Sequence, residues 1–176
     1  SPALMLGDVE KNVAVIASEA RKLAQRGCRL AVFPELCLTG YSCADLFHTD
    51  SLRLAALRGL DEVAGATQDL AMVIVVGLPL VVQDRMYNVA AVLAKGRVLG
   101  VVPKTFLPNS AEFYERRWFS PSDTLTATTL RLHGQDVPVG TDLLFEARDV
   151  AGFVLGVEIC EDLWTPIPPS SYAALA

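Results

Sequence analysis

Histidine is scarce in this sequence, and positive charge is outweighed by negative charge. The only histidines are His48 and His133, and no Gly-x-Ser-x-Gly or Cys-Gly-x-Cys-Trp motif surrounds a candidate nucleophile. Ser-His-Asp and papain-type Cys-His catalysis are therefore not supported. The formal net charge is −5, and the 15 Lys and Arg residues are scattered. This distribution argues against a nucleic-acid partner, because neutralising phosphates requires clustered cations.

Long apolar runs and paired cysteines are also missing. No window approaches the roughly 18 to 20 consecutive apolar residues of a membrane span, so no membrane partner is expected. No signal peptide is recognisable at the start, which predicts a reducing, cytoplasmic location. The cysteines show neither Cys-x-x-Cys spacing nor a nearby histidine cluster, so no metal site is predicted. The four cysteines are Cys28, Cys37, Cys43 and Cys160.

The first half of the sequence predicts helices that alternate with buried strands. Its 176 residues, 52% of them hydrophobic, correspond to about one domain with a single core. Asp8 is a suitable N-cap for the first helix and Gly27 a suitable C-cap, while Pro34 ends the first strand. The predicted segments are a helix over 9–24, a strand over 29–33, a helix over 51–67 and a strand over 72–78.

The second half changes pattern. Residues 87–94 and 98–102 predict a β-hairpin, with Lys95-Gly96-Arg97 as the turn. A polar loop over 105–122 follows. Weaker strands are expected at 125–132 and 143–147, and a strong strand at 153–159. Helical crossovers together with hairpins predict a layered α/β or α+β fold with helices on one face of a sheet.

Three reactive side chains occupy the same place in the pattern, at or just beyond the end of a buried strand. They are Glu35, Lys104 and Cys160. Strand ends of one polarity converge on a crevice in such sheets, so these groups are expected to meet. An ammonium favours the thiolate form of cysteine, and a carboxylate can accept the thiol proton. The alternative is a purely structural Glu35–Lys104 ion pair, with Cys160 as apolar filler.

Five longer motifs follow one another along the chain. They are Phe33-Pro-Glu-Leu-Cys-Leu-Thr-Gly-Tyr41, Pro103-Lys-Thr-Phe-Leu-Pro-Asn109, Phe113-Tyr-Glu-Arg-Arg-Trp-Phe119, Pro138-Val-Gly-Thr-Asp-Leu-Leu-Phe145 and Glu158-Ile-Cys-Glu-Asp-Leu-Trp164. In this order they resemble the nitrilase, or carbon-nitrogen hydrolase, superfamily. Within it, the chain is most similar to the glutaminase domain of glutamine-dependent NAD synthetases. The resemblance implies an α-β-β-α sandwich, present here as an incomplete portion.

The resemblance also implies roles for individual residues. Cys160 would attack the side-chain amide of glutamine and form a thioester, with Glu35 as general base and acid. Lys104 would stabilise the oxyanion, together with the backbone N–H of Glu161. Glu115 would be an additional active-site carboxylate.

The resemblance further suggests substrate-pocket residues, namely Tyr41 and the side chain of Glu161. The family commonly has an aromatic residue after Leu-Pro-Asn, whereas this chain has Ser110. That difference predicts a change in pocket shape or glutamine affinity and leaves the mechanism unchanged.

For domain organisation, residues 1–176 are expected to be a partial glutaminase domain. The rest of that domain and a synthetase domain of the same polypeptide, which would use ATP and magnesium, are expected to lie outside it. No cofactor is expected in this chain, whereas a homo-oligomer is. Whether the fragment is active alone is left open. Two alternative functions remain, a stand-alone amidase acting on another small amide and a non-catalytic interaction module.

Overall fold

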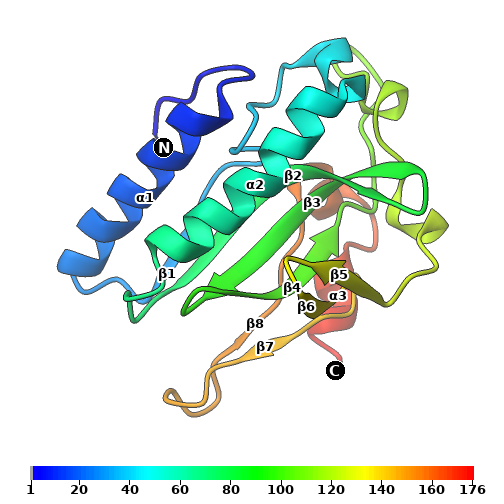
Figure 1. The fold of residues 1–176 in the computed structure, drawn as a ribbon. Helices are drawn as coiled ribbons and strands as arrows, with labels where there is room; N and C mark the ends of the chain where they lie inside the picture. Colours follow the sequence, from blue (N-terminus) through cyan, green and yellow to red (C-terminus); the bar gives the residue numbers. More distant parts are fainter. Residues whose placement is uncertain (1) are drawn as a thin grey trace.

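The computed structural model describes residues 2–176, which form a layer of two helices against a four-stranded sheet. Helices α1 (Val9–Gln25) and α2 (Asp50–Ala66) run side by side over one face of the sheet (Figure 1). The strand order is β1-β2-β3-β4, with β1 parallel to β2 and the other neighbours antiparallel. The sheet strands are β1 (Leu30–Val32), β2 (Val73–Val82), β3 (Arg85–Ala94) and β4 (Arg97–Pro103).

Local signals explain where the two helices begin and end. The Asp8 carboxylate accepts a hydrogen bond from the backbone N–H of Lys11 at 3.1 Å, as the sequence predicted for an N-cap. The C-cap residue is Arg26, one position before the predicted Gly27. Gly27 follows the cap in the left-handed conformation at φ +83°. Helix α2 has Thr49 as its N-cap. None of the helices formed by residues 2–176 combines the length and apolar character that crossing a membrane requires.

Strands β2 and β3 present different side chains to the two faces of the sheet. Ile74, Val76 and Leu78 belong to the large core beneath α1 and α2, whereas Val75 packs with Ala90 in a smaller cluster on the opposite face. The alternation follows from the two-residue period of a strand. Both faces are therefore buried over the middle of the sheet, which accounts for the continuous apolar runs in the sequence.

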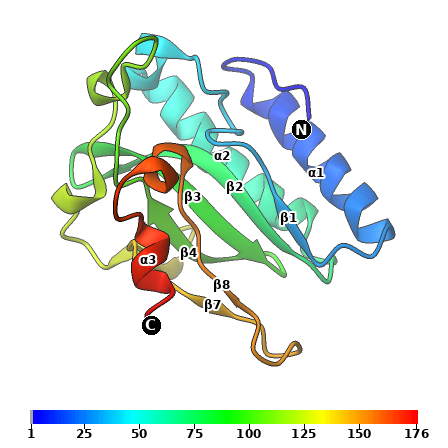
Figure 2. The same cartoon turned by 180° about the vertical axis from the view of Figure 1, so that it is seen from behind.

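The segment that leads to Cys160 covers the second face. We call residues 143–164 the Cys160 arm. It comprises β7 (Phe145–Glu146), β8 (Val154–Leu155) and the 3-10 helix η4 (Cys160–Trp164), and it is followed by the short helix α3 (Pro169–Ala173). Figure 2 shows the arm and α3 in front of the sheet, on the side away from α1 and α2. On this face, residues 2–176 form one small two-stranded sheet, the antiparallel pair β7–β8.

The predicted strand over residues 153–159 is wrong in its extent, because only Val154 and Leu155 are in regular pairing. Strand β7 offers only two residues as partners, so the ladder stops before Gly156. Val154 is half exposed, whereas Ile159 is buried against the sheet. The apolar residues of this segment therefore serve mainly to pack Ile159 against the sheet, and only two of them pair as a strand.

The single strand expected over 125–132 is instead part of a hairpin. The hairpin consists of β5 (Thr129–Leu132) and β6 (Gln135–Pro138), joined by His133 and Gly134, which both have positive φ. The Lys95–Gly96 turn likewise has positive φ at both residues, and it is one residue shorter than predicted because Arg97 begins β4. Two residues of positive φ are typical of the type I′ turns that close tight hairpins.

Gly77 in β2 allows the chain around Glu35 to lie directly against the sheet. A Cβ atom at this position would stand 2.3 Å from the backbone nitrogen of Leu36 and 3.1 Å from the Cα of Glu35. The backbone of Gly77 also accepts a hydrogen bond from Leu38 N–H at 3.1 Å. The absence of a side chain at Gly77 therefore sets the position of the loop that carries Glu35.

We predict that Gly77→Ala displaces this loop and destabilises the protein by about 1–3 kcal/mol, as overpacking does in other cores. Thermal unfolding measures the change. Gly65→Ala is the matched control, because a Cβ at Gly65 in α2 meets nothing within 4 Å and alanine favours helix by about 1 kcal/mol. Equal melting temperatures for the two variants would contradict the close approach at Gly77.

Candidate active site

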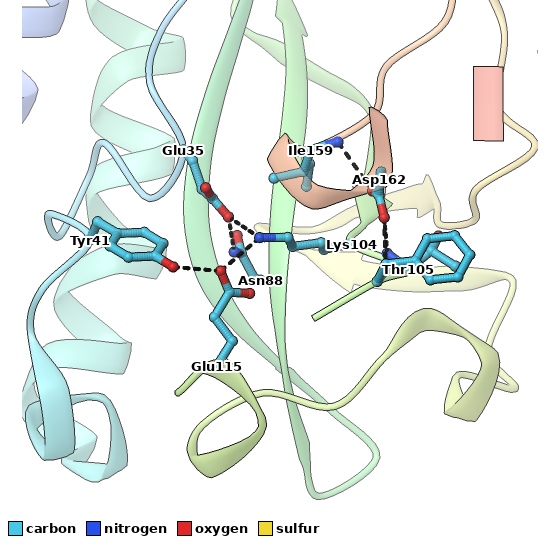
Figure 3. Close-up of polar contacts among 9 residues, drawn as sticks. Glu35, Tyr41, Asn88, Lys104, Thr105, Glu115, Ile159 and Asp162 are labelled. Atoms are coloured by element: carbon cyan, nitrogen blue, oxygen red, sulfur yellow. Dashed lines mark hydrogen bonds and ion pairs between the residues drawn. The ribbon is translucent and has the colours of Figure 1, made fainter. Parts of the chain in front are cut away.

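Lys104 is completely buried at the end of β4 and binds two carboxylates. Its Nζ lies 2.7 Å from Glu35 Oε1 and 2.7 Å from Glu115 Oε1 (Figure 3). Glu35 comes from the loop after β1, and Glu115 from the 3-10 helix η2 (Glu115–Arg117) in the long polar loop. A buried ammonium requires such partners, because an unpaired charge in the interior is very unfavourable.

Two further side chains extend this cluster. Tyr41 donates from its hydroxyl to Glu115 Oε1 at 2.7 Å, and Asn88 donates from Nδ2 to Glu35 Oε1 at 2.5 Å (Figure 3). Tyr41 is partly buried, whereas Asn88 and Glu115 are each 1% exposed. The Glu115 Oε2 and Asn88 Oδ1 atoms are buried and have no hydrogen-bond partner among the described residues.

Cys160 lies at the mouth of the same cluster. Its thiol is exposed, its backbone is in the left-handed region at φ +49°, and it begins η4. Positive φ is uncommon for a residue with a side chain and is found at strained functional turns. Cys160, Glu35 and Asn88 line one cavity of about 110 Å³ between the sheet and the Cys160 arm.

Burial and charge shift the pKa values of this cluster in different directions. Burial lowers the pKa of Lys104, but its ion pairs with Glu35 and Glu115 outweigh that effect, so the net shift is upward and the ammonium is retained. Burial raises the pKa of Glu115 despite its bonds with Lys104 and Tyr41. The pKa of Tyr41 is raised by burial and by Glu115. Burial and the Glu35 carboxylate raise the pKa of Cys160, whereas Lys104 lowers it to a smaller degree.

Asp162 connects the Cys160 arm to the segment after Lys104, a role that the sequence reasoning missed. Its Oδ1 accepts hydrogen bonds from the backbone N–H groups of Thr105 at 3.0 Å and Phe106 at 2.7 Å, and its Oδ2 accepts one from Ile159 at 3.1 Å (Figure 3). The carboxylate is 1% exposed, and burial raises its pKa despite these bonds. The available signal was an aspartate two residues after the candidate nucleophile, within the motif Glu158-Ile-Cys-Glu-Asp-Leu-Trp164.

The remaining predicted residues lie outside this hydrogen-bonded cluster. Glu161 follows Cys160 in η4 and is half-buried, and Ser110 is exposed in the polar loop. The structure thus brings Glu35, Lys104 and Glu115 into direct contact and places Cys160 beside them. Within residues 2–176, no group of three or more His, Cys, Asp or Glu side chains is arranged to hold a metal ion.

Comparison with known proteins identifies the family whose members this chain resembles. The family model described as carbon-nitrogen hydrolase matches residues 3–173. The chain is 50% identical over 171 residues to the glutamine-dependent NAD(+) synthetase of Mycobacterium tuberculosis and 34% identical over 174 residues to that of Thermotoga maritima. These alignments cover 97% of this chain in both cases, and 25% and 26% of the relatives. The chain therefore spans about a quarter of the length of these curated relatives.

Solved structures give the same result for the fold. A glutamine-dependent NAD(+) synthetase from Cytophaga hutchinsonii superposes with a TM-score of 0.81 and 32% identity, covering 90% of this chain and 26% of that chain. An amidase from Nesterenkonia sp. has a TM-score of 0.68 at 20% identity, covering 93% of this chain and 54% of that chain. The amidase shows the shared fold alone. The predicted nitrilase-like fold is confirmed.

We predict that Asp162→Ala lowers the free energy of unfolding by about 3 kcal/mol, because buried backbone N–H groups lose their acceptor. Chemical denaturation measures the loss. Asp136→Ala is the control, since the exposed Asp136–Arg131 ion pair of 2.8 Å contributes at most about 1 kcal/mol. A loss for Asp162→Ala no greater than that of the control would show that the three bonds do not hold the arm.

We also predict an unusual pH dependence for alkylation of Cys160 by iodoacetamide. Only the thiolate reacts, and the raised pKa of Cys160 keeps the group protonated at neutral pH. The rate is therefore expected to keep rising at pH values where an ordinary thiol, of pKa about 8.5, has levelled off. Peptide mass spectrometry follows the reaction.

Cys37 is the internal control for that measurement. It is fully buried, and burial raises its pKa to about 12, so it stays unmodified while the protein is folded. A rate at Cys160 that levels off below pH 8 would show a preformed thiolate, contrary to this prediction.

Proposed function

Because the chain belongs to the carbon-nitrogen hydrolase family, we propose that it hydrolyses the side-chain amide of glutamine through a thioester on Cys160, giving glutamate and ammonia. The ammonia would serve a synthetase domain of the same polypeptide, which forms NAD from deamido-NAD. The observation that carries the proposal is the meeting of Lys104 with Glu35 and Glu115, each at 2.7 Å, beside the exposed Cys160 thiol. The chain is also 50% and 34% identical to glutamine-dependent NAD synthetases from two bacteria.

The first chemical step requires a base. The pKa of Cys160 is raised by burial and by Glu35, so the resting group is a thiol rather than a thiolate. In the proposed mechanism, Glu35 takes the thiol proton as sulfur bonds to the amide carbon. General-base assistance of this kind typically contributes about 10²–10⁴-fold in rate. The amide oxygen then carries the negative charge of the tetrahedral intermediate.

Lys104 is suited to stabilise that oxygen. Its ammonium is fully buried and its pKa is raised by Glu35 and Glu115, which keeps the positive charge in place. A donor fixed before the reaction begins needs no reorganisation as charge develops. The backbone N–H of Glu161 is the proposed second donor, because it follows the nucleophile directly.

The remaining steps return the site to its starting state. The carbon–nitrogen bond breaks, and Glu35 gives its proton to the departing nitrogen, which leaves as ammonia. Water then loses a proton to Glu35 and adds to the thioester carbon. The carbon–sulfur bond breaks, glutamate leaves, and Cys160 recovers the proton as a thiol. Each proton that Glu35 accepts is thus returned within the cycle.

The partners outside this site are part of the same proposal. ATP and magnesium are assigned to the synthetase domain, and the complete enzyme is proposed to be a homo-oligomer. Tyr41 and the Glu161 side chain are proposed to contact glutamine. Tyr41 is the better supported of the two, because it is bonded to Glu115 next to Lys104. The exposed Ser110 is proposed to change glutamine affinity.

We predict that Cys160→Ala in the complete protein reduces glutamine-dependent NAD synthesis by at least about 10⁴-fold, as removal of a nucleophile does elsewhere. Synthesis from free ammonium is expected to remain, because that reaction does not need the thioester. Coupled assays with each nitrogen source measure both rates. Cys28→Ala, at a half-buried cysteine remote from the cluster, is the matched control.

The same assays separate the alternatives. Equal loss of both activities in Cys160→Ala would contradict the division of labour. Faster ammonia release from aliphatic amides than from glutamine would favour a stand-alone amidase. Failure of a glutamine-like electrophile to label Cys160 in the complete protein would favour a non-catalytic module.

A further inference from the structure

Asn88 lies on the sheet face beneath the Cys160 arm. Alternate residues of β3 point to opposite faces, and Ala90 and Val92, two and four positions after Asn88, pack against Ile159 of the arm. Asn88 therefore continues the row of side chains that faces the arm. It lines the same cavity as Glu35 and Cys160.

The side chain of Asn88 makes a single hydrogen bond within the described residues. Its Nδ2 donates to Glu35 Oε1 at 2.5 Å, while its Oδ1 is buried without a partner. Asn12, which is also completely buried, is different. Asn12 donates to Met5 O at 2.8 Å and Leu38 O at 3.1 Å, and it accepts from Met5 N at 2.8 Å.

The difference in hydrogen bonding between Asn88 and Asn12 indicates why position 88 carries an amide. A buried carbonyl oxygen without a donor is unfavourable, and an apolar side chain of the same shape would avoid that cost. A buried position in β3 does not by itself require an amide, because leucine has the same branching at Cγ and no oxygen to satisfy. Leucine could not donate a hydrogen bond to Glu35. The amide at position 88 is therefore explained by its contact with the candidate active site rather than by a role in folding.

The bond has a definite effect on the Glu35 carboxylate. Oε1 receives two donors, Lys104 Nζ at 2.7 Å from the residue after β4 and Asn88 Nδ2 at 2.5 Å from β3. The Asn88 and Lys104 bonds both go to Oε1 and neither of them to Oε2, and the Cys160 thiol is close enough to the same carboxylate for Glu35 to raise its pKa. Two donors on one oxygen fix the rotation of the carboxylate and leave the other oxygen open.

We propose that Asn88 is a positioning residue that holds Glu35 Oε1 together with Lys104, so that Oε2 is the oxygen that exchanges protons with Cys160 and the departing nitrogen. This inference rests on the proposed function. The other titratable groups around Glu35 are Glu115 from η2, Cys160 from η4, Tyr41 from the loop after β1, and Lys104, which directly follows β4.

The test compares Asn88→Leu with Asn12→Leu in the complete protein. For Asn88→Leu, we expect the Tm to change little and kcat for glutamine hydrolysis to fall by about 10- to 100-fold, the effect of a misplaced catalytic group, with little change in KM. For Asn12→Leu, a clear fall in Tm is expected, because three satisfied hydrogen bonds are lost.

Asn88→Asp provides a second variant that keeps the shape and polarity of the side chain. Ionised aspartate cannot donate to Oε1, so kcat is again expected to fall. Wild-type kcat in either Asn88 variant overturns the proposal. A fall in Tm for Asn88→Leu as large as that for Asn12→Leu also overturns it, because Asn88 would then have a structural role.

A crystal structure of Asn88→Leu keeps this inference separate from the proposed function. If the wild-type protein releases no ammonia from glutamine, the proposed function fails, but the position of Glu35 can still be compared. A rotated Glu35 carboxylate supports the positioning role. A Glu35 carboxylate that stays in place on Lys104 in the variant disproves it whatever the substrate.

Discussion

The arrangement of the site depends on one buried ammonium, that of Lys104. It is enclosed at the end of β4 and needs negative charge around it, which Glu35 and Glu115 supply from two separate loops. Removing either carboxylate would leave a charge poorly compensated in the interior, at a cost of several kcal/mol. The long loop that carries Glu115 is therefore fixed against the sheet by the same interaction that prepares the site for chemistry.

The fold supplies the geometry that this interaction requires. Gly77 has no side chain, so the Glu35 loop can lie on β2, and β4 ends where Lys104 can reach that loop. Tyr41 then donates to Oε1 of Glu115, and Asn88 donates to Oε1 of Glu35. Each carboxylate oxygen that contacts Lys104 thus has a second donor, which fixes the position of both carboxylates around the ammonium.

Features set by local sequence were predictable, whereas those set by contacts between distant residues were not. The helix after Asp8 and the hairpin at Gly96 depend on neighbouring residues and matched the prediction closely. Glu35, Lys104, Glu115 and Cys160 were identified because they follow buried strands or lie in family motifs, and their catalytic roles stay predictions. Asn88 and Asp162 were missed, because the Asn88 bond spans 53 positions and two of the three Asp162 bonds span 56 and 57 positions. The strand before Cys160 was overestimated, because apolar composition does not reveal whether a strand has a partner.

The Cys160 arm packs on the sheet through few buried apolar residues, which affects how this part of the protein opens. The helix-covered face contains most of the buried apolar residues, whereas Ile159 is the one buried apolar residue that the Cys160 arm contributes to the other face. Regions with few buried contacts open at lower free energy than the core. Local opening of the Cys160 arm is therefore expected at a lower free energy than global unfolding, so that Cys160 can move away from Glu35 and Lys104 while the four-stranded sheet stays folded.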